Sequence, residues 1–155
     1  MNAYLAVKTL HILSAAVLFG TGMGIASFML MAHRTRDLAA IRTTCRHVVV
    51  ADWCFTAPAV VVQPLSGLWL MHAAGHAFDG GWFALVVALY GLAGICWLPV
   101  VAIQVRLRDA AQAAPSIDAL DARYWQLFRW WLALGVPAFG AVLALFWVMV
   151  ARPLL

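Results

Sequence analysis

The chain has 155 residues, of which 66% are hydrophobic and only 10% are charged. A soluble domain carries about 25% charged residues, and so short a chain cannot bury this much apolar surface in one globule. The composition therefore excludes an ordinary soluble domain. Because the arginines behind the net charge of +4 cluster in two places, they favour membrane topology over nucleic-acid binding.

Four apolar stretches are long enough to cross a bilayer, which takes about 20 residues of helix. They cover residues 4–32, 48–72, 82–105 and 130–151. The first begins rather like a signal peptide, but its apolar run continues too far, so we expect a retained span. The expected fold class is an all-α membrane protein, a four-transmembrane-helix bundle that forms a single domain over residues 1–155.

Basic residues set the expected orientation of these spans. Eight of the ten lie in the first and third polar loops: Arg34, Arg36, Arg42, Arg46, Arg106, Arg108, Arg123 and Arg129. Only Lys8 and Arg152 lie toward the termini, and the loop 72–81 has none. The positive-inside rule then places both arginine-rich loops in the cytoplasm and both termini outside. Tryptophans fall near the outer interface (Trp69, Trp82, Trp147) and the inner one (Trp53, Trp125, Trp130, Trp131), as aromatic belts do.

A faint repeat relates the two halves of the chain. The first and third spans both end in R-x-R-D, at residues 34–37 and 106–109. The pattern suggests two parallel helical hairpins. The alternative, that stop-transfer charges and belt tryptophans recur by necessity, stays open. Prolines at 58, 64, 99 and 137 predict kinks in three of the four helices.

Polar residues inside spans are costly and often functional. They are His11, Ser14, Asp52, Thr56, Gln63, Tyr90 and Gln104. His11 lies about 10 Å into the first span by helix rise, with Ser66 and Tyr90 near its level and Gln63 slightly deeper. We expect its imidazole either to be satisfied by a hydrogen bond or to bind a metal.

The outer loop adds His72 and His76, which are four residues apart. On a helix they would share a face and could chelate a transition metal, with Met71 as a nearby sulfur ligand. Gly75 is expected to end the helix, which weakens that geometry. An ordinary polar loop is the alternative.

Asp52 lies about one turn into the second span, where a bare carboxylate is expensive. We expect a structural ion pair or hydrogen bond with Arg46, Arg106, Arg129 or Gln104, and a proton relay is the alternative.

Ala16, Gly20 and Gly24 follow one another at intervals of four residues, so they lie on one face of the helix. Such a stripe of small residues favours close helix packing, or it leaves room for a porphyrin. The cysteines, Cys45, Cys54 and Cys96, form no CxxC pair and are expected to be small buried residues.

Several short motifs resemble a bacterial family of predicted integral membrane proteins of unknown function. They are Lys8-Thr9-Leu10-His11 with Gly20, Gly22 and Gly24, then Ala51-Asp52-Trp53, Gln63 to Trp69, Cys96-Trp97-Leu98-Pro99, and Tyr124-Trp125 with Phe128-Arg129. The resemblance covers nearly the whole chain, and it implies a multi-pass protein of the bacterial inner membrane. It implies no activity.

A looser resemblance, on Lys8-x-x-His11, is to HemJ-like protoporphyrinogen oxidases and CopD-like copper-resistance proteins. The HemJ-like proteins bind haem b through membrane histidines, which makes His11 a candidate axial ligand. The chain departs from their pattern because it has no lysine after Lys8. Oxidase activity therefore does not follow from this resemblance alone.

The leading hypothesis is a haem-b-binding membrane oxidoreductase for electron transfer or porphyrin oxidation. Its cofactor contacts would be His11, His72 as second axial ligand, Gly20, Gly24, Gln63 and Tyr90, with Lys8 or Arg152 near the propionates. A site for copper or another metal at Met71, His72 and His76, a non-catalytic accessory subunit, and transport of a small molecule are the alternatives. The expected partners are the lipid bilayer and a homo-oligomer or partner membrane subunit, with no nucleic acid.

Overall fold

The computed structural model describes residues 2–76, 78 and 80–151, which leaves Arg152 outside the described part. The elements, in chain order, are α1 (Ala3–Thr35), α2 (Leu38–Ala51), the π-helix η1 (Asp52–Thr56), α3 (Ala57–Ala73), α4 (Gly81–Ala113), the 3-10 turn η2 (Ile117–Ala119) and α5 (Ala122–Ala151). Four helical segments are long and apolar enough to span a membrane: Ala3–Thr35, Leu38–Ala73, Gly81–Ala113 and Ala122–Ala151. The all-helical, four-span prediction is confirmed.

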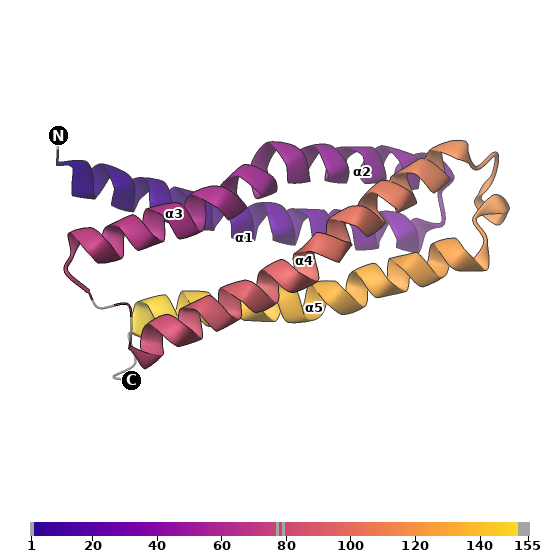
Figure 1. Ribbon diagram of the computed structural model, residues 1–155. Helices are drawn as coiled ribbons and strands as arrows, with labels where there is room; N and C mark the ends of the chain where they lie inside the picture. The colour runs from indigo at the N-terminus through magenta and orange to yellow at the C-terminus, as the bar shows by residue number, and fades with distance from the viewer. Residues whose placement is uncertain (1, 77, 79, 152–155) are drawn as a thin grey trace.

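The four spans lie side by side with both arginine-rich turns at one end of the bundle. Figure 1 shows the start of α1 and the end of α5 at the opposite end from the α1–α2 and α4–α5 turns. Helices α4 and α5 pack along each other, α1 packs on both α2 and α3, and α2 packs on α4. The structure therefore gives the bundle one strongly basic end.

The helices run well past the apolar stretches, so the polar stretches 34–47 and 106–129, which were expected to be loops, contain the turns but are mostly helical. Only Arg36 and Asp37 interrupt the helix between α1 and α2, and residues 114–121 join α4 to α5. Arg36 adopts a left-handed conformation with φ 56°, and the Asp37 side chain accepts a hydrogen bond from the Ala39 N–H at 2.9 Å. Hydropathy marks the depth of the hydrocarbon, whereas a helix can continue in water.

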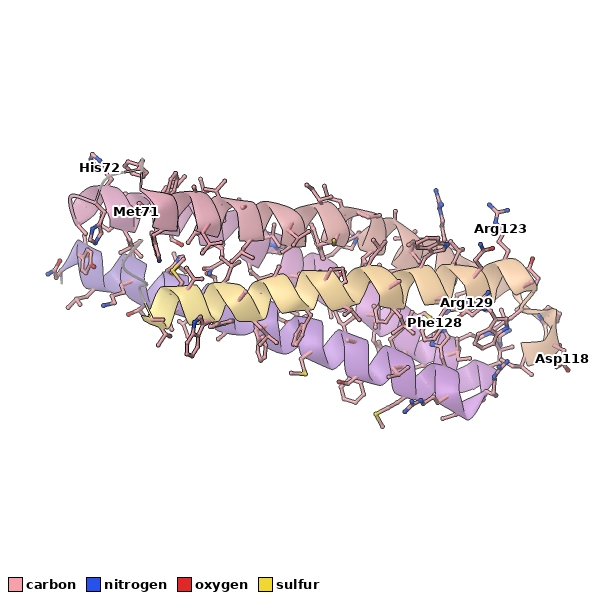
Figure 2. The ribbon with its side chains drawn as sticks, turned by 90° about the horizontal axis from the view of Figure 1, so that it is seen from below. Met71, His72, Asp118, Arg123, Phe128 and Arg129 are labelled. Atoms are coloured by element: carbon pink, nitrogen blue, oxygen red, sulfur yellow. The ribbon has the colours of Figure 1, made fainter. Side chains whose placement is uncertain are left out.

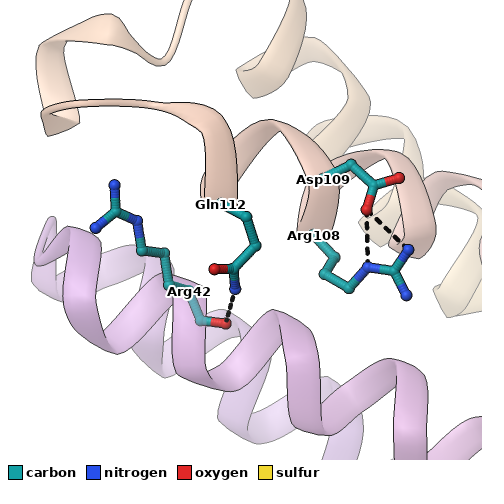
Figure 3. Close-up of polar contacts among 4 residues, drawn as sticks. All are labelled: Arg42, Arg108, Asp109 and Gln112. Carbon is teal, nitrogen blue, oxygen red and sulfur yellow. Dashed lines mark hydrogen bonds and ion pairs between the residues drawn. The ribbon is translucent and has the colours of Figure 1, made fainter.

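The two R-x-R-D motifs differ locally. The first contains the break between α1 and α2, whereas the second remains helical inside α4. There, Arg108 pairs with its neighbour Asp109 at 2.8 Å, as Figure 3 shows. At these motifs the two halves of the chain therefore do not repeat one another.

Arg42 of α2 joins the two halves at the basic end. Its guanidinium donates hydrogen bonds to the carbonyls of Ala111, at 2.9 Å, and Ala114, where α4 ends. In return, the Gln112 Nε2 donates to the Arg42 carbonyl at 3.2 Å (Figure 3). The last carbonyls of a helix lack partners within it, so a cationic side chain there stabilises the helix end.

The best-packed core lies toward this basic end. Its most deeply buried side chains are Met29, Ile41, Cys45 and Leu107. Of the predicted interfacial tryptophans, Trp53 and Trp147 are 62% and 73% exposed. Trp131 was wrongly assigned to the belt, because only 4% of it is exposed and it packs within the core. Cys45 and Cys96 are buried as expected, whereas Cys54 is exposed.

The second span contains a π-helical turn. The Ala57 N–H bonds to the carbonyl of Asp52, five residues earlier. Pro58 follows directly, and proline can neither donate to the carbonyl four residues back nor pack against it, so a wider turn suits it. Figure 1 shows the span changing direction where α2 gives way to α3. Prolines 64, 99 and 137 lie inside α3, α4 and α5, which continue through them.

We expect the basic end to face the cytoplasm. Reporter fusions at residue 37 and at residue 116, both within turns of the basic end, should give cytoplasmic signals, because translocating either turn would carry several arginines across the bilayer. A fusion after Leu155 should give an external signal. A cytoplasmic signal from that last fusion would contradict the orientation.

Candidate functional site

His11 meets Ser66 where α1 packs on α3. The two side chains approach to 2.8 Å between the His11 Nδ1 and the Ser66 Oγ. His11 is partly buried, and Ser66 is buried. The contact confirms the expectation that these residues share a level, which came from counting helix rise from the outer ends of two spans.

The hydroxyl of Ser66 fixes the tautomer of His11. Its Oγ donates to the Val62 carbonyl at 2.6 Å, and a hydroxyl has a single proton to give. Toward His11 it therefore acts as an acceptor, so the imidazole carries its proton on Nδ1. The Gln63 carbonyl, which can only accept, also lies beside this ring. His11 Nε2 keeps its lone pair and has no hydrogen-bond partner within the described residues.

Gly67 lets the His11 ring approach the backbone of α3. A Cβ placed on Gly67 would lie 3.2 Å from His11 Cε1, 3.8 Å from Nδ1 and 4.0 Å from Nε2. The distance of 3.2 Å from this Cβ to His11 Cε1 is shorter than an ordinary van der Waals contact between carbon atoms. The absence of a side chain at 67 therefore positions the ring.

We expect Gly67→Ala to be worse tolerated than Gly91→Ala. Both glycines lie in helix interiors, but a Cβ at Gly91 meets nothing within 4 Å. Alanine usually stabilises a helix by roughly 0.5–1 kcal/mol relative to glycine. Thermal unfolding in detergent should show that Gly91→Ala stabilises the protein by this amount. Gly67→Ala should not stabilise it, because the new methyl group displaces His11 from Ser66. Equal gains would contradict the close approach.

Ser14 and Gln63 extend the polar group around His11. The buried Ser14 hydroxyl donates to the Gln63 Oε1 or to the His11 carbonyl, which lies at 3.0 Å. Gln63 thus belongs to the same group, as predicted. Tyr90 does not, because its hydroxyl donates to the Val60 carbonyl at 2.5 Å.

The structure does not bring His72 to the His11 imidazole. His72 lies exposed in the last turn of α3, at the end of the bundle opposite Arg123 and Asp118 in Figure 2. Ser66, which His11 contacts, is six residues earlier, or about 9 Å along the helix. A shared iron would therefore require α3 to shift, and His72 as second axial ligand stays a prediction.

His72 and His76 do not share a helical face. Helix α3 ends at Ala73, and Gly75 turns the chain with φ +68°. Beyond it, the His76 N–H bonds to the Met71 carbonyl at 3.0 Å. The expected chelating geometry is therefore not formed. Over residues 2–76, 78 and 80–151, no group of three or more His, Cys, Asp or Glu side chains could hold a metal ion.

Gly20 and Gly24 face open space. A Cβ added to either would meet nothing within 4 Å, so they do not form a close helix contact inside the chain. Since a helix turns by about 100° per residue, Gly20 points to the side of α1 opposite His11. Contact of Gly20 and Gly24 with a porphyrin ring stays a prediction.

A second polar group surrounds Asp52, near the junction of α2 and α3. Asp52 and Thr56 belong to η1, and each is only 4% exposed. Helix α4 adds Trp97 and Gln104, which are seven residues apart and so share one face. Thr56, Gln104 and Trp97 all approach the carboxyl group of Asp52.

This group is polar but incompletely hydrogen-bonded. Within the described chain, five buried side-chain atoms lack a partner of ordinary geometry: Asp52 Oδ2, Thr56 Oγ1, Trp97 Nε1, Gln104 Oε1 and Trp131 Nε1. An unsatisfied buried polar atom costs about 1–3 kcal/mol, and native proteins keep few of them. The expected ion pair of Asp52 is not formed in the part of the chain described, where Arg108–Asp109 is the pair observed.

His33 is a residue that the sequence pattern did not single out. It is 3% exposed, and its ring stacks on Phe128 with centroids 3.9 Å apart. Nδ1 donates to the Met29 carbonyl at 2.7 Å, so Nε2 accepts from the Tyr124 hydroxyl at 2.8 Å. The signal available was the spacing of Tyr124 and Phe128 by four residues, which lines up aromatic rings on one face of a helix.

Beside His33 lies a basic cavity at the end of the bundle that carries Arg129 in Figure 2. It measures about 450 Å³ and is lined by His33, Arg34, Arg36, Trp125, Phe128 and Arg129. The Arg36 guanidinium lies over the Trp125 ring, 4.1 Å from its centroid. Stacking orients this cation, as cation–π contacts do.

The comparison with family models adds one positive finding. The chain matches the model of DUF2269, a family described as predicted integral membrane proteins, over residues 5–153. It belongs to this family. Membership of DUF2269 confirms the resemblance to an integral membrane family of unknown function and agrees with the four spans.

The remaining comparisons leave the activity of this DUF2269 protein to be argued from its residues. No curated protein and no solved structure matched the chain. The looser resemblance to HemJ-like and CopD-like proteins is not supported by the family match. The features of the chain that could carry a function are the two polar groups around His11 and around Asp52.

Proposed function

We propose that this protein is a multi-pass membrane protein that binds haem b through His11 and serves electron transfer or porphyrin oxidation. The single observation that carries the proposal is the hydrogen bond from His11 Nδ1 to Ser66 Oγ, at 2.8 Å, which leaves Nε2 free. A histidine that ligates a metal usually donates its other N–H to a nearby acceptor, which fixes the ring and raises its basicity.

The donor set favours haem over a bare metal ion. A closed site for copper or zinc takes three or four protein ligands, and the described residues offer no such cluster. Haem brings four nitrogen ligands of its own and needs only one or two from the protein. A lone membrane histidine with a fixed tautomer fits one axial position.

The surrounding residues supply orientation and a suitable charge. When bound, haem b would accept and release one electron. Ser66 and Gly67 hold the His11 ring in place, and the Ser14–Gln63 contact ties α1 to α3 next to it. Lys8, one turn toward the outer end and exposed, can meet a carboxylate at the membrane surface. No contact among the described residues favours the copper or accessory-subunit alternatives.

The proposal is tested by the absorbance of protein purified in mild detergent after expression with ample haem. The wild type should show a Soret band that sharpens on reduction, and His47→Ala should keep it because His47 is exposed and far from His11 in sequence. His11→Ala should lose or shift it. A colourless, well-folded wild type that does not take up added hemin would end the haem proposal, and copper binding by the same preparation would favour the alternative.

A further inference from the structure

Asp52 forms no ion pair with a basic side chain of the described residues. Helix α1 carries no Lys, Arg, Asp or Glu between Lys8 and Arg34, and α3 carries none at all. The titratable side chains of these two helices in that range are His11, His33 and His72. The nearest arginines, Arg46 on the same span, Arg106 on α4 and Arg129 on α5, are exposed, and none pairs with Asp52 within the described residues. An ionised carboxylate buried in a span without a partner is strongly unfavourable.

The buried atoms that lack a hydrogen-bond partner also indicate which species this group could bind. Trp97 Nε1 is a donor only, Gln104 Oε1 is an acceptor, and Thr56 Oγ1 is both. A bare metal cation would be repelled by an indole N–H pointing toward it. A protonated carboxyl group and a water molecule, by contrast, can donate to Gln104 and accept from Trp97.

The π-helical turn strengthens the case for a functional group. Such turns are rare and occur often at functional sites, because they sacrifice regular helix bonding to re-aim side chains. Here η1 begins at Asp52 and ends at Thr56, and both side chains point inward to near-complete burial. Trp131 lies at the same level as Gln104, since each is nine residues from the α4–α5 turn.

We propose that Asp52 is the proton-binding residue of a buried water site formed with Thr56, Trp97 and Gln104. A hydronium ion from the water at the basic end gives its proton to Asp52 Oδ2, where an O–H bond forms, and a neutral water molecule is left behind. The carboxylate thereby becomes a neutral acid. Release reverses this step. The site is independent of haem, because it lies on η1 and α4, whereas His11 contacts α3.

The test is infrared spectroscopy of the full-length protein in lipid at pH 7. The chain contains no glutamate, so side-chain carboxyl bands come from its six aspartates alone. Only a protonated carboxyl group gives the carboxylic-acid C=O band, because a carboxylate absorbs at lower frequency. The wild type should show one carboxylic-acid C=O band that shifts to lower frequency in D2O. Asp52→Asn should lose this band, and Asp118→Asn, at an exposed position, should keep it.

Two further outcomes keep the proposal open to refutation. If Asp52→Asn does not fold, Gln104→Leu should move the wild-type band to higher frequency, because the acid loses a hydrogen-bond acceptor. A wild type without a protonated carboxyl band at pH 7 would overturn the proposal. A band that survives Asp52→Asn, or that Gln104→Leu leaves unmoved, would overturn it as well.

Discussion

Replacing His33 with alanine should destabilise the protein by about 3 kcal/mol. The substitution removes a buried ring that stacks on Phe128 and leaves a cavity, for which large-to-small changes cost roughly 2–5 kcal/mol. It also leaves the Tyr124 hydroxyl without its 2.8 Å partner. A buried hydroxyl that loses its hydrogen-bond partner typically costs about 1–3 kcal/mol of stability. Part of the destabilisation expected for His33→Ala therefore comes from this lost hydrogen bond.

The measurement is unfolding in mixed micelles followed by tryptophan fluorescence. Tyr124→Phe should cost less than His33→Ala, because it removes one hydrogen bond and keeps the packing. The double variant should be less destabilised than the sum of the two singles, since they share that bond. His47→Ala, at an exposed position of α2, is the matched control and should stay within about 0.5 kcal/mol of wild type. Equal losses at His33 and His47 would contradict the packing described.

Replacing His11 with alanine should abolish haem binding, and replacing Ser66 with alanine should only weaken it. Ser66 Oγ accepts a hydrogen bond from the Nδ1–H of His11. Its proposed role is to orient the His11 ring, and it would not bind the iron itself. Loss of such an outer partner typically costs 10–100-fold in metal affinity. Hemin titrations should therefore give no specific binding for His11→Ala and a correspondingly raised Kd for Ser66→Ala.

Ser27→Ala is the control for this pair, because Ser27 is an exposed serine on the same helix as His11. Its hemin affinity should equal that of the wild type. If Ser66→Ala bound hemin as tightly as Ser27→Ala did, the hydrogen bond would have no part in positioning the ligand. Weak binding by all three variants would point to loss of folding, which the unfolding measurement above would reveal.

The spans were predictable from sequence, but the helix ends were not. Hydropathy located all four apolar stretches because it reports which residues tolerate hydrocarbon. It placed Arg42 in a loop, although this residue lies on α2 and hydrogen-bonds to the end of α4. Helices remain hydrogen-bonded when they leave the hydrocarbon, so a polar stretch at a membrane surface can still be helical.

The candidate site was predictable where residues faced each other across antiparallel spans. Counting helix rise placed Ser66 at the level of His11, and the two are in contact. The same count placed Tyr90 there, but depth gives no rotation about the helix axis, and Tyr90 instead bonds to Val60. His33 was missed because it directly precedes Arg34 and looked like the edge of a polar loop. Gln104 was expected as a partner of Asp52, and it approaches that carboxyl group. The part played by Thr56 depended on a π-helical turn, which leaves no periodic trace in sequence.

The measurement that most directly tests His11 as a haem ligand is an equilibrium titration of hemin into purified wild type and His11→Ala, followed at the Soret band. We predict that the wild type saturates at one haem per chain with a sharp band that responds to reduction. His11→Ala should give only the broad, unsaturable absorbance of hemin dissolved in detergent. Superimposable titration curves for the two proteins would contradict the account.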